Sequence, residues 1–167
     1  MVEVELDLTE AWGEDQNWQA LSEQAVAEAF RFSSYGNLAS AAFTLSLSIN
    51  LSTNDEVHAL NAQWRGKDKP TNVLSFPMLE RDELTALANT DDGEALLGDL
   101  ILAHGVCAAE AEEKGIPLAD HVTHLIIHGT LHLLGYDHST EEEKAVMWAE
   151  QAKVLERLGL SRIKIQE

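Results

Sequence analysis

The chain has 167 residues, of which 45% are hydrophobic and 24% charged, as expected for one globular domain. Its 11 basic and 29 acidic residues give a net charge of −18, which disfavours binding to nucleic acid and favours solubility. The single cysteine, Cys107, excludes an intramolecular disulfide. The first residues lack the pattern of a signal peptide, and no apolar run reaches membrane-spanning length. We therefore expect one cytoplasmic domain over residues 1–167.

The spacing of apolar residues predicts the strands and helices in chain order. Short apolar runs, alternating with polar residues in the first two, predict strands over 2–8, 43–51, 72–77 and 98–103. Spacings of three and four predict helices over 18–30, 53–64, 104–114, 117–134 and 141–158. Thr53 and Thr140, each with a glutamate three residues later, predict capped helix starts. Residues 33–37 are expected to form a polar turn, and the acidic segment 80–94 a mobile loop with or without one short helical turn.

The order of these elements predicts an α+β fold. We expect a single compact domain with a four-stranded mixed sheet covered by about five helices. The helix that carries most of the histidines is expected in the middle of the fold, because it is hydrophobic nearly all round. The order of the strands within the sheet is left open.

Three histidines, His128, His132 and His138, stand at offsets 0, 4 and 10. Residues four apart share one face of a helix, so the first two can offer imidazoles to a single ion. Gly135 is placed to end the helix and to turn His138 back over the same face. One metal ion would satisfy three buried imidazoles together. Three protein ligands with an open position are typical of a catalytic zinc, which we predict here.

The same spacing occurs in the zinc peptidase motif H-E-x-x-H-x-x-G-x-x-H. In that motif a glutamate follows the first histidine and acts as the general base, whereas this chain has Gly129. The ligand set of the peptidase is therefore present, but its base is missing.

A basic loop over residues 65–70 contains three of the eleven basic residues: Arg65, Lys67 and Lys69. A guanidinium presents a planar set of donors that suits phosphate oxygens, so Arg65 is the candidate for holding an anionic substrate. The alternative is a solvated surface turn.

Several other polar residues have no single assigned role. His124 lies one turn before His128 and is interpreted as a supporting or packing residue rather than a fourth ligand. Asp137 either orients a ligand, acts on bound water or simply forms the turn, and Asp99 either bonds turn amides or supports the site. The remaining histidines, among them His121, have no distinctive spacing.

Three segments of the chain resemble the YbeY family of bacterial endoribonucleases and rRNA maturation factors. They are HGTLHLLGYDH at 128–138, RGKDKPTNVLSFP at 65–77 and LGDLIL at 97–102, within a match over about residues 45–158. Asn72 stands where that family usually has aspartate. The resemblance implies a compact α+β fold, with one zinc ion on His128, His132 and His138 and an important arginine at Arg65.

The resemblance also implies an activity. It is metal-dependent cleavage of single-stranded RNA, in 3′-end maturation of small-subunit ribosomal RNA and in ribosome quality control. The implied partners are ribosomal RNA and the ribosome or a protein bound to it. Two alternatives stay open: a zinc peptidase, and a ribosome-binding factor whose zinc only holds the fold.

Overall fold

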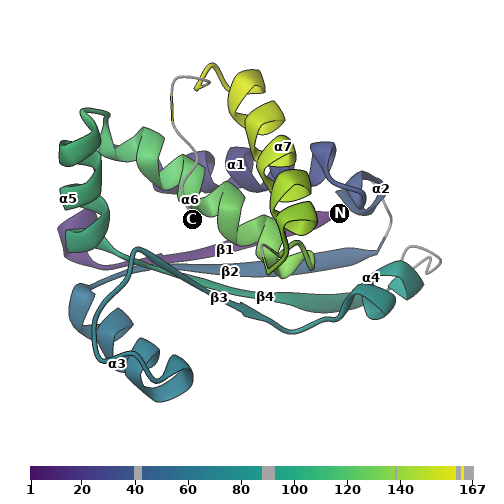
Figure 1. Cartoon of the computed structure of the whole chain (residues 1–167), viewed down its shortest axis with the longest axis horizontal. Helices are drawn as coiled ribbons and strands as arrows, with labels where there is room; N and C mark the ends of the chain where they lie inside the picture. The colour runs from purple at the N-terminus through teal and green to yellow at the C-terminus, as the bar shows by residue number, and fades with distance from the viewer. Residues whose placement is uncertain (40–42, 88–92, 138, 161–162, 164–167) are drawn as a thin grey trace.

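The computed structural model describes residues 1–39, 43–87, 93–137, 139–160 and 163 (Figure 1). Four strands form one mixed sheet in the order β1-β2-β4-β3: β1 (Val2–Leu8), β2 (Thr44–Ser52), β3 (Val73–Pro77) and β4 (Glu94–Ala103). Both β1 and β4 run parallel to β2, and β3 runs antiparallel to β4. The prediction of a four-stranded mixed sheet is therefore confirmed.

Strand β4 begins at Glu94, earlier than the predicted start at residue 98. Its first residues pair with the beginning of β2, and the register then shifts, so that Leu96 faces Ser46 while Gly98 faces Leu47. One extra residue on β4 is the mark of a β-bulge, which the glycine accommodates with a φ of 155°. The bulge interrupts the period of two, and this is why the sequence pattern placed the start of the strand too late.

The five long helices are confirmed within a few residues of their predicted ends. They are α1 (Trp18–Phe32), α3 (Asn54–Arg65), α5 (His104–Lys114), α6 (Leu118–Leu133) and α7 (Glu141–Arg157). The hydroxyls of Thr53 and Thr140 accept the backbone N–H of Glu56 and Glu143, as the two predicted N-caps require. In the part of the chain that the structure describes, no helix is both long and apolar enough to cross a membrane.

Two short helices lie in predicted loops: α2 (Gly36–Ala39) corrects the prediction of a polar turn, whereas α4 (Arg81–Leu87) agrees with the short helical turn that was allowed in the acidic segment. Helix α2 extends from the predicted polar turn, and α4 occupies the first half of the predicted acidic loop. Each contributes one fully buried leucine to the core, Leu38 and Leu84. Since a short helix is not stable by itself in water, this tertiary contact is what stabilises it. Residues 88–92 of the predicted loop lie outside the described residues.

The helices form layers on the two faces of the sheet (Figure 1). Helices α1, α6 and α7 cover one face, and α3 packs on the other. Helix α6 lies in the middle of the larger layer, where Ile126, Ile127 and Leu131 are completely buried. The predicted central helix that bears the histidines is therefore confirmed. Gly129 allows its close approach to the sheet, because a Cβ there would lie 2.7 Å from Leu100 Cδ2.

Helix α6 ends as the sequence predicts. Gly135 has a φ of 92°, a left-handed conformation that residues with a side chain rarely adopt. The N–H groups of Gly135 and Tyr136 donate to the carbonyl oxygens of His132 and Leu131, both at 3.0 Å. The chain thus reverses directly after the last histidine of the helix.

Candidate functional site

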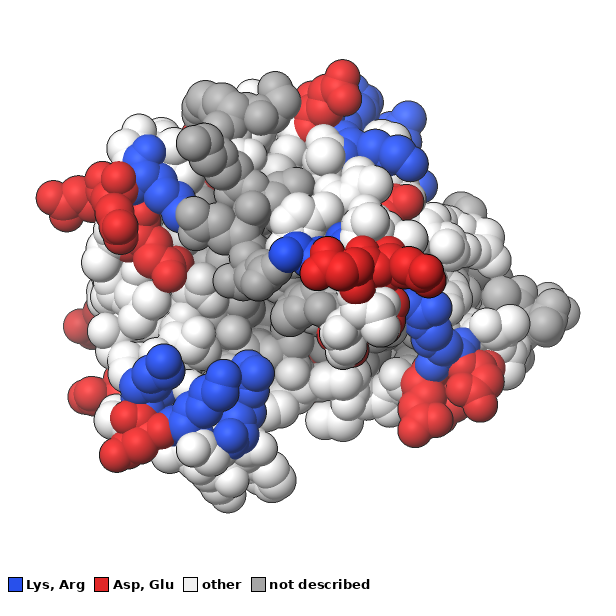
Figure 2. All heavy atoms as spheres, viewed as in Figure 1, with Lys and Arg blue, Asp and Glu red and all other residues white. Residues whose placement is uncertain are grey.

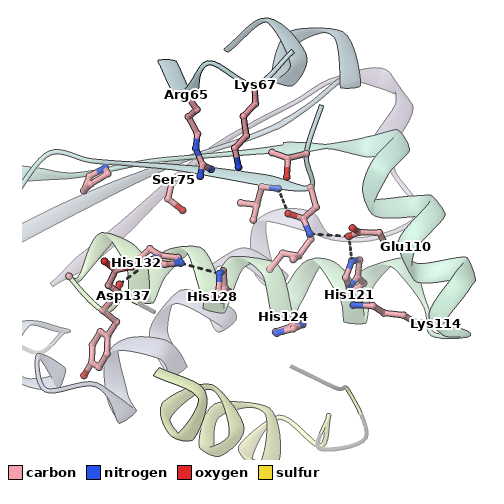
Figure 3. A pocket seen from close by; sticks show the side chains of 17 residues that line it. Arg65, Lys67, Ser75, Glu110, Lys114, His121, His124, His128, His132 and Asp137 are labelled. Atoms are coloured by element: carbon pink, nitrogen blue, oxygen red, sulfur yellow. Dashed lines mark hydrogen bonds and ion pairs between the residues drawn. The ribbon is translucent and has the colours of Figure 1, made fainter. Parts of the chain in front are cut away.

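A cleft of about 660 Å³ lies between helix α6, strand β3, helix α5 and the loop that follows α3 (Figure 3). His128 and His132 line it from α6, and Arg65 and Lys67 line it from the opposite side. Two segments that the sequence analysis singled out, 65–77 and 128–138, therefore meet across one cavity.

The two histidines point their Nε2 atoms at each other. These atoms are 3.1 Å apart, and the ring planes are nearly perpendicular, at 83°. In a tetrahedral zinc site with Zn–N bonds of about 2.0–2.1 Å, two ligand nitrogens are about 3.3 Å apart. The observed spacing therefore fits two neighbouring ligands of one ion.

The predicted third ligand, His138, lies outside the described residues. Within the described ranges, no group of three or more His, Cys, Asp or Glu side chains is placed to hold a metal ion. The three-histidine site therefore remains a prediction, for which the structure supplies the geometry of two members.

The loop after α6 fixes the orientation of His132. The Nδ1–H of His132 donates to the backbone oxygen of Tyr136 at 3.0 Å, which leaves the lone pair of a neutral imidazole on Nε2. The buried Tyr136 is held in turn, because its hydroxyl accepts the backbone N–H of Ser34 at 3.0 Å. On its other side, the Arg81 guanidinium lies 5.6 Å from the Tyr136 ring centroid, and Arg81 Nε–H donates to the oxygen of Gly135 at 3.0 Å.

The basic loop is anchored at both ends of its first turn. Lys67 N–H donates to the oxygen of Asn61 at 3.2 Å, and the buried Asn61 amide donates to the oxygen of Lys69 at 2.8 Å. Arg65 and Lys67 extend from this loop towards α6 in Figure 3, whereas Lys69 does not line the cleft. Figure 2 shows a group of Lys and Arg side chains at the end of the molecule where Figure 1 draws α3. Two of the three predicted basic residues thus face the histidine pair.

The far end of the cleft contains a group that the sequence analysis missed. His121 Nε2–H donates to Glu110 Oε1 at 2.8 Å, and the Asn72 side-chain amide donates to the same oxygen at 3.0 Å (Figure 3). Burial alone would raise the pKa of Glu110, but the hydrogen bonds from His121 and Asn72 outweigh it and hold that pKa below its usual range. The carboxylate is therefore ionised at neutral pH.

A signal for His121 was present in the sequence. Together with His124, His128 and His132 it forms a series at offsets 0, 3, 7 and 11, which places all four on one face of a helix. All four line the cleft. Glu110 had no such signal, because it comes from α5 and meets this face only through the tertiary fold.

Three residues had no single role assigned from the sequence: His124, Asp137 and Asp99. The buried His124 donates through Nε2 to Gln151 Oε1 on α7 at 3.2 Å, and burial lowers its pKa to about 4. Asp137 is exposed, lines the cleft and accepts the hydroxyl of Ser139 at 2.7 Å. Asp99 lies in β4 beside Ser48 and Phe76 and does not line the cleft.

A cleft that brings paired imidazoles opposite cationic side chains has the character of a hydrolytic enzyme for an anionic substrate. The pattern of one family, Endoribonuclease YbeY, matches residues 8–159 of this chain. The chain therefore belongs to the Endoribonuclease YbeY family, and it is an enzyme, a nuclease of the hydrolase class. The predicted family and the predicted enzyme class are confirmed.

Individual relatives are similar in sequence to this chain over almost its whole length. Endoribonuclease YbeY of Rhizorhabdus wittichii is 50% identical over 167 residues, covering 100% of this chain and 96% of the relative. Endoribonuclease YbeY of Sphingopyxis alaskensis is 48% identical over 161 residues, covering 96% of both chains. The solution structure of TM1509 from Thermotoga maritima has a similar fold, with a TM-score of 0.54 at 23% identity, over 98% of this chain and 97% of that one.

Proposed function

We propose that residues 1–167 form a single metal-dependent hydrolase domain that cleaves single-stranded RNA with one zinc ion per chain. The observation that carries the proposal is the pair His128 and His132, whose Nε2 atoms lie 3.1 Å apart in a cleft also lined by Arg65. The substrate class comes from the name of the relatives, Endoribonuclease YbeY. His138 is proposed as the third metal ligand.

The donor set supports zinc. Three neutral imidazoles are suitable ligands for Zn²⁺, although nickel, copper and iron also accept them. When bound, zinc would supply an activated water or a polarised phosphoryl oxygen. The hydrogen bond from His132 Nδ1 to the Tyr136 oxygen keeps the Nε2 lone pair directed towards His128, so the chain orients this ligand before the metal arrives.

Arg65 is proposed to act on the substrate directly. Its guanidinium lines the cleft opposite the histidine pair, where it can neutralise negative charge that develops at phosphorus. Lys67 lines the same wall and is placed for an adjacent phosphate group. Because a guanidinium can bind two phosphate oxygens at once, lysine is a poor substitute at position 65.

The charge of the chain limits its unaided affinity for RNA. A net charge of −18 repels a polyanion, and the three basic residues of the loop can neutralise only a few phosphates. For a single strand they correspond to a log–log salt slope of about −2. We therefore propose that the ribosome, or a protein bound to it, brings the substrate in the cytoplasm, in 3′-end maturation of small-subunit ribosomal RNA and in ribosome quality control.

A zinc peptidase is the second candidate, because the histidine spacing matches that class. The packing of Gly129 weighs against it. A Cβ at this position would lie 2.7 Å from Leu100 Cδ2 and 3.3 Å from Ser75 Oγ, so a larger residue here would require these side chains to shift. The chain thus carries no glutamate base at the position where the peptidases carry theirs, and the packing of Gly129 disfavours one.

The test compares three substrates: labelled single-stranded RNA, a matched duplex and unfolded casein, each with and without a chelator. We expect metal-dependent cleavage of the single strand only, and loss of this activity and of bound zinc in His132→Ala. Arg65→Ala is expected to lose most activity while retaining zinc and its melting temperature. Lys153→Ala, at an exposed lysine of α7 that does not line the cleft, is the control and should cleave nearly as fast as the parent.

Two results would contradict the proposal. Metal-dependent proteolysis with intact RNA would establish the peptidase instead. RNA cleavage that persists equally in His132→Ala would show that the activity belongs to a contaminating nuclease.

A further inference from the structure

The cleft is also lined by a negatively charged side chain, which disfavours the binding of phosphate next to it. Glu110 lines the same cavity as Arg65, Lys67 and Lys114, and its side chain is one-third exposed. Its pKa is held below the usual range, so it is negatively charged when the enzyme works. A phosphate brought against it would be repelled. The part of an RNA chain that meets Glu110 must therefore carry a hydrogen-bond donor.

Only one oxygen of this carboxylate is open to a ligand. Oε1 already accepts from His121 at 2.8 Å and from Asn72 at 3.0 Å. In the described part of the chain no hydrogen bond reaches Oε2. His121 is fully buried, and the side-chain oxygen of Asn72 accepts the N–H of Val73 at 2.7 Å, so both donors are held firmly. The carboxylate is thus fixed in position and presents a single acceptor to the cleft.

This geometry selects among the donors of RNA. The Watson–Crick edge of guanine offers two adjacent donors and needs both oxygens of a carboxylate, but Oε1 is already saturated. A single acceptor suits a lone hydroxyl, and the ribose 2′-hydroxyl is present on every nucleotide whatever its base. It is also the group that DNA lacks.

We propose that Glu110 accepts a hydrogen bond from the 2′-hydroxyl of a nucleotide bound beside the histidine pair and thereby selects RNA over DNA. With DNA in the cleft, the ionised Oε2 would lose contact with water and gain no donor in return. Leaving a charged acceptor desolvated and without a hydrogen bond is strongly unfavourable. This inference rests on the proposed cleavage of RNA. It makes Glu110 a specificity-determining residue, held in position by His121 and Asn72.

Glu110 does not lie at the histidine pair, where the reacting phosphate is proposed to bind, but further along α6. Its partner His121 precedes His128 by seven residues, which corresponds to about 10.5 Å of helix. The contact is therefore expected with a ribose next to the cleavage site, not with the scissile phosphate itself. Nor is this end of the cleft a second metal site, since no suitable group of three side chains occurs in the described ranges.

The experiment is a double-mutant cycle in which Glu110 of the enzyme and one 2′-hydroxyl of the substrate are changed separately and together. The probe is a single-stranded oligoribonucleotide with a mapped cut, together with a series in which one ribose at a time is replaced by its 2′-deoxy form. For the parent enzyme we expect one sensitive position beside the cut, where 2′-deoxy or 2′-fluoro lowers kcat/KM about 10- to 100-fold, the range for a hydrogen bond to a charged group. In Glu110→Ala the same loss should appear with the all-ribose probe, and 2′-deoxy at that position should cause little further loss.

A second variant guards against misfolding. Glu110→Gln retains an oxygen for His121 and Asn72 and places an amide donor where Oε2 was. A 2′-fluoro group, which accepts but cannot donate, should then be tolerated better than 2′-deoxy. Glu113→Ala, which removes an exposed carboxylate from the same helix, is the matched control and should leave the sensitive position unchanged. Circular dichroism and zinc content establish that each variant is folded and loaded.

The outcomes separate this inference from the function on which it rests. If the parent does not cleave the all-ribose probe, the proposed function fails and the role of Glu110 falls with it. If the parent cleaves it but the effects of Glu110→Ala and 2′-deoxy multiply at every position, the two groups do not touch and only the role of Glu110 is wrong. Coupling of Glu110→Ala to the identity of a base, with none to a ribose, would also overturn it.

Discussion

The first prediction concerns the buried His124 and the effect of its burial on the pH dependence of stability. It is 2% exposed and donates one hydrogen bond to Gln151 on the neighbouring helix. Burial lowers its pKa from the ordinary 6.5 to about 4, because the charged imidazolium would lose its hydration, and the hydrogen bond to Gln151 offsets this only in part. His124 is therefore neutral in the folded protein at any pH near neutrality.

The sign of the resulting pH dependence follows from the two states. Below pH 6.5 the unfolded chain binds a proton at His124, and the folded protein does not until about pH 4. The stability that comes from keeping this group neutral is thus complete above pH 6.5 and is lost as the pH falls towards 4. One pH unit corresponds to about 1.4 kcal/mol, so between pH 6.5 and 5 the loss is about 2 kcal/mol.

The perturbation is His124→Gln, which removes the titrating group. Unfolding free energies of parent and variant are measured by urea titration at several pH values between 5 and 7.5, in identical buffers, so that other titrating groups cancel in the difference. We expect the parent to lose about 2 kcal/mol more than the variant between pH 6.5 and 5. If His124→Gln runs parallel to the parent, His124 is not held neutral by burial and the argument is wrong.

Two further predictions concern stability and reactivity. Gly98→Ala should destabilise the protein by about 1–3 kcal/mol, measured by thermal or urea unfolding, because its Cβ would lie 2.5 Å from the backbone oxygen of Phe76. Gly13→Ala, whose Cβ would meet nothing within 4 Å, controls for the left-handed φ alone. Burial, reinforced by Glu110, raises the pKa of Cys107 to about 12, so the fully buried thiol should resist iodoacetamide at pH 8 and react only after unfolding, as mass spectrometry will show.

The sequence predicted those parts of the molecule in which neighbours in the chain determine the structure. The spacing of His128 and His132 on one helix, and the reversal at Gly135, follow from local backbone geometry, and both are present. The alternation of β2 was readable for the same reason, because one of its faces is buried and the other is not.

The parts that could not be predicted depend on contacts between distant segments. The strand order places β4 between β2 and β3, and in this arrangement Glu110 of α5 lines the cleft. The acidic composition of residues 80–94 predicted a loop with or without one short helical turn, since nothing local indicates that Leu84 is buried. The resulting helix, α4, carries Arg81 to the end of α6, a contact that no spacing in the sequence suggests.

The last prediction concerns Arg81: affinity for the proposed zinc ion depends on this residue, which is not a proposed ligand. Its Nε–H donates to the Gly135 oxygen, and its guanidinium lies over the Tyr136 ring, 5.6 Å from the centroid, so it holds the loop whose Tyr136 oxygen orients His132. Loss of such a supporting contact typically costs 10- to 100-fold in metal affinity, and because this one is exposed we expect about 10-fold for Arg81→Ala.

Arg81→Lys separates the two contacts, since it keeps a cation for the Tyr136 ring but has no Nε–H for the Gly135 oxygen. We expect an intermediate affinity, measured by competition with a chromophoric chelator, with little change in melting temperature because the side chain lies on the surface. Arg31→Ala, at another exposed arginine whose guanidinium lies 5.7 Å from an aromatic ring centroid, is the matched control and should bind zinc like the parent. Equal zinc affinity in the parent and Arg81→Ala would mean that the loop holds its conformation without α4, and that the hydrogen bond between His132 and Tyr136 needs no support from that helix.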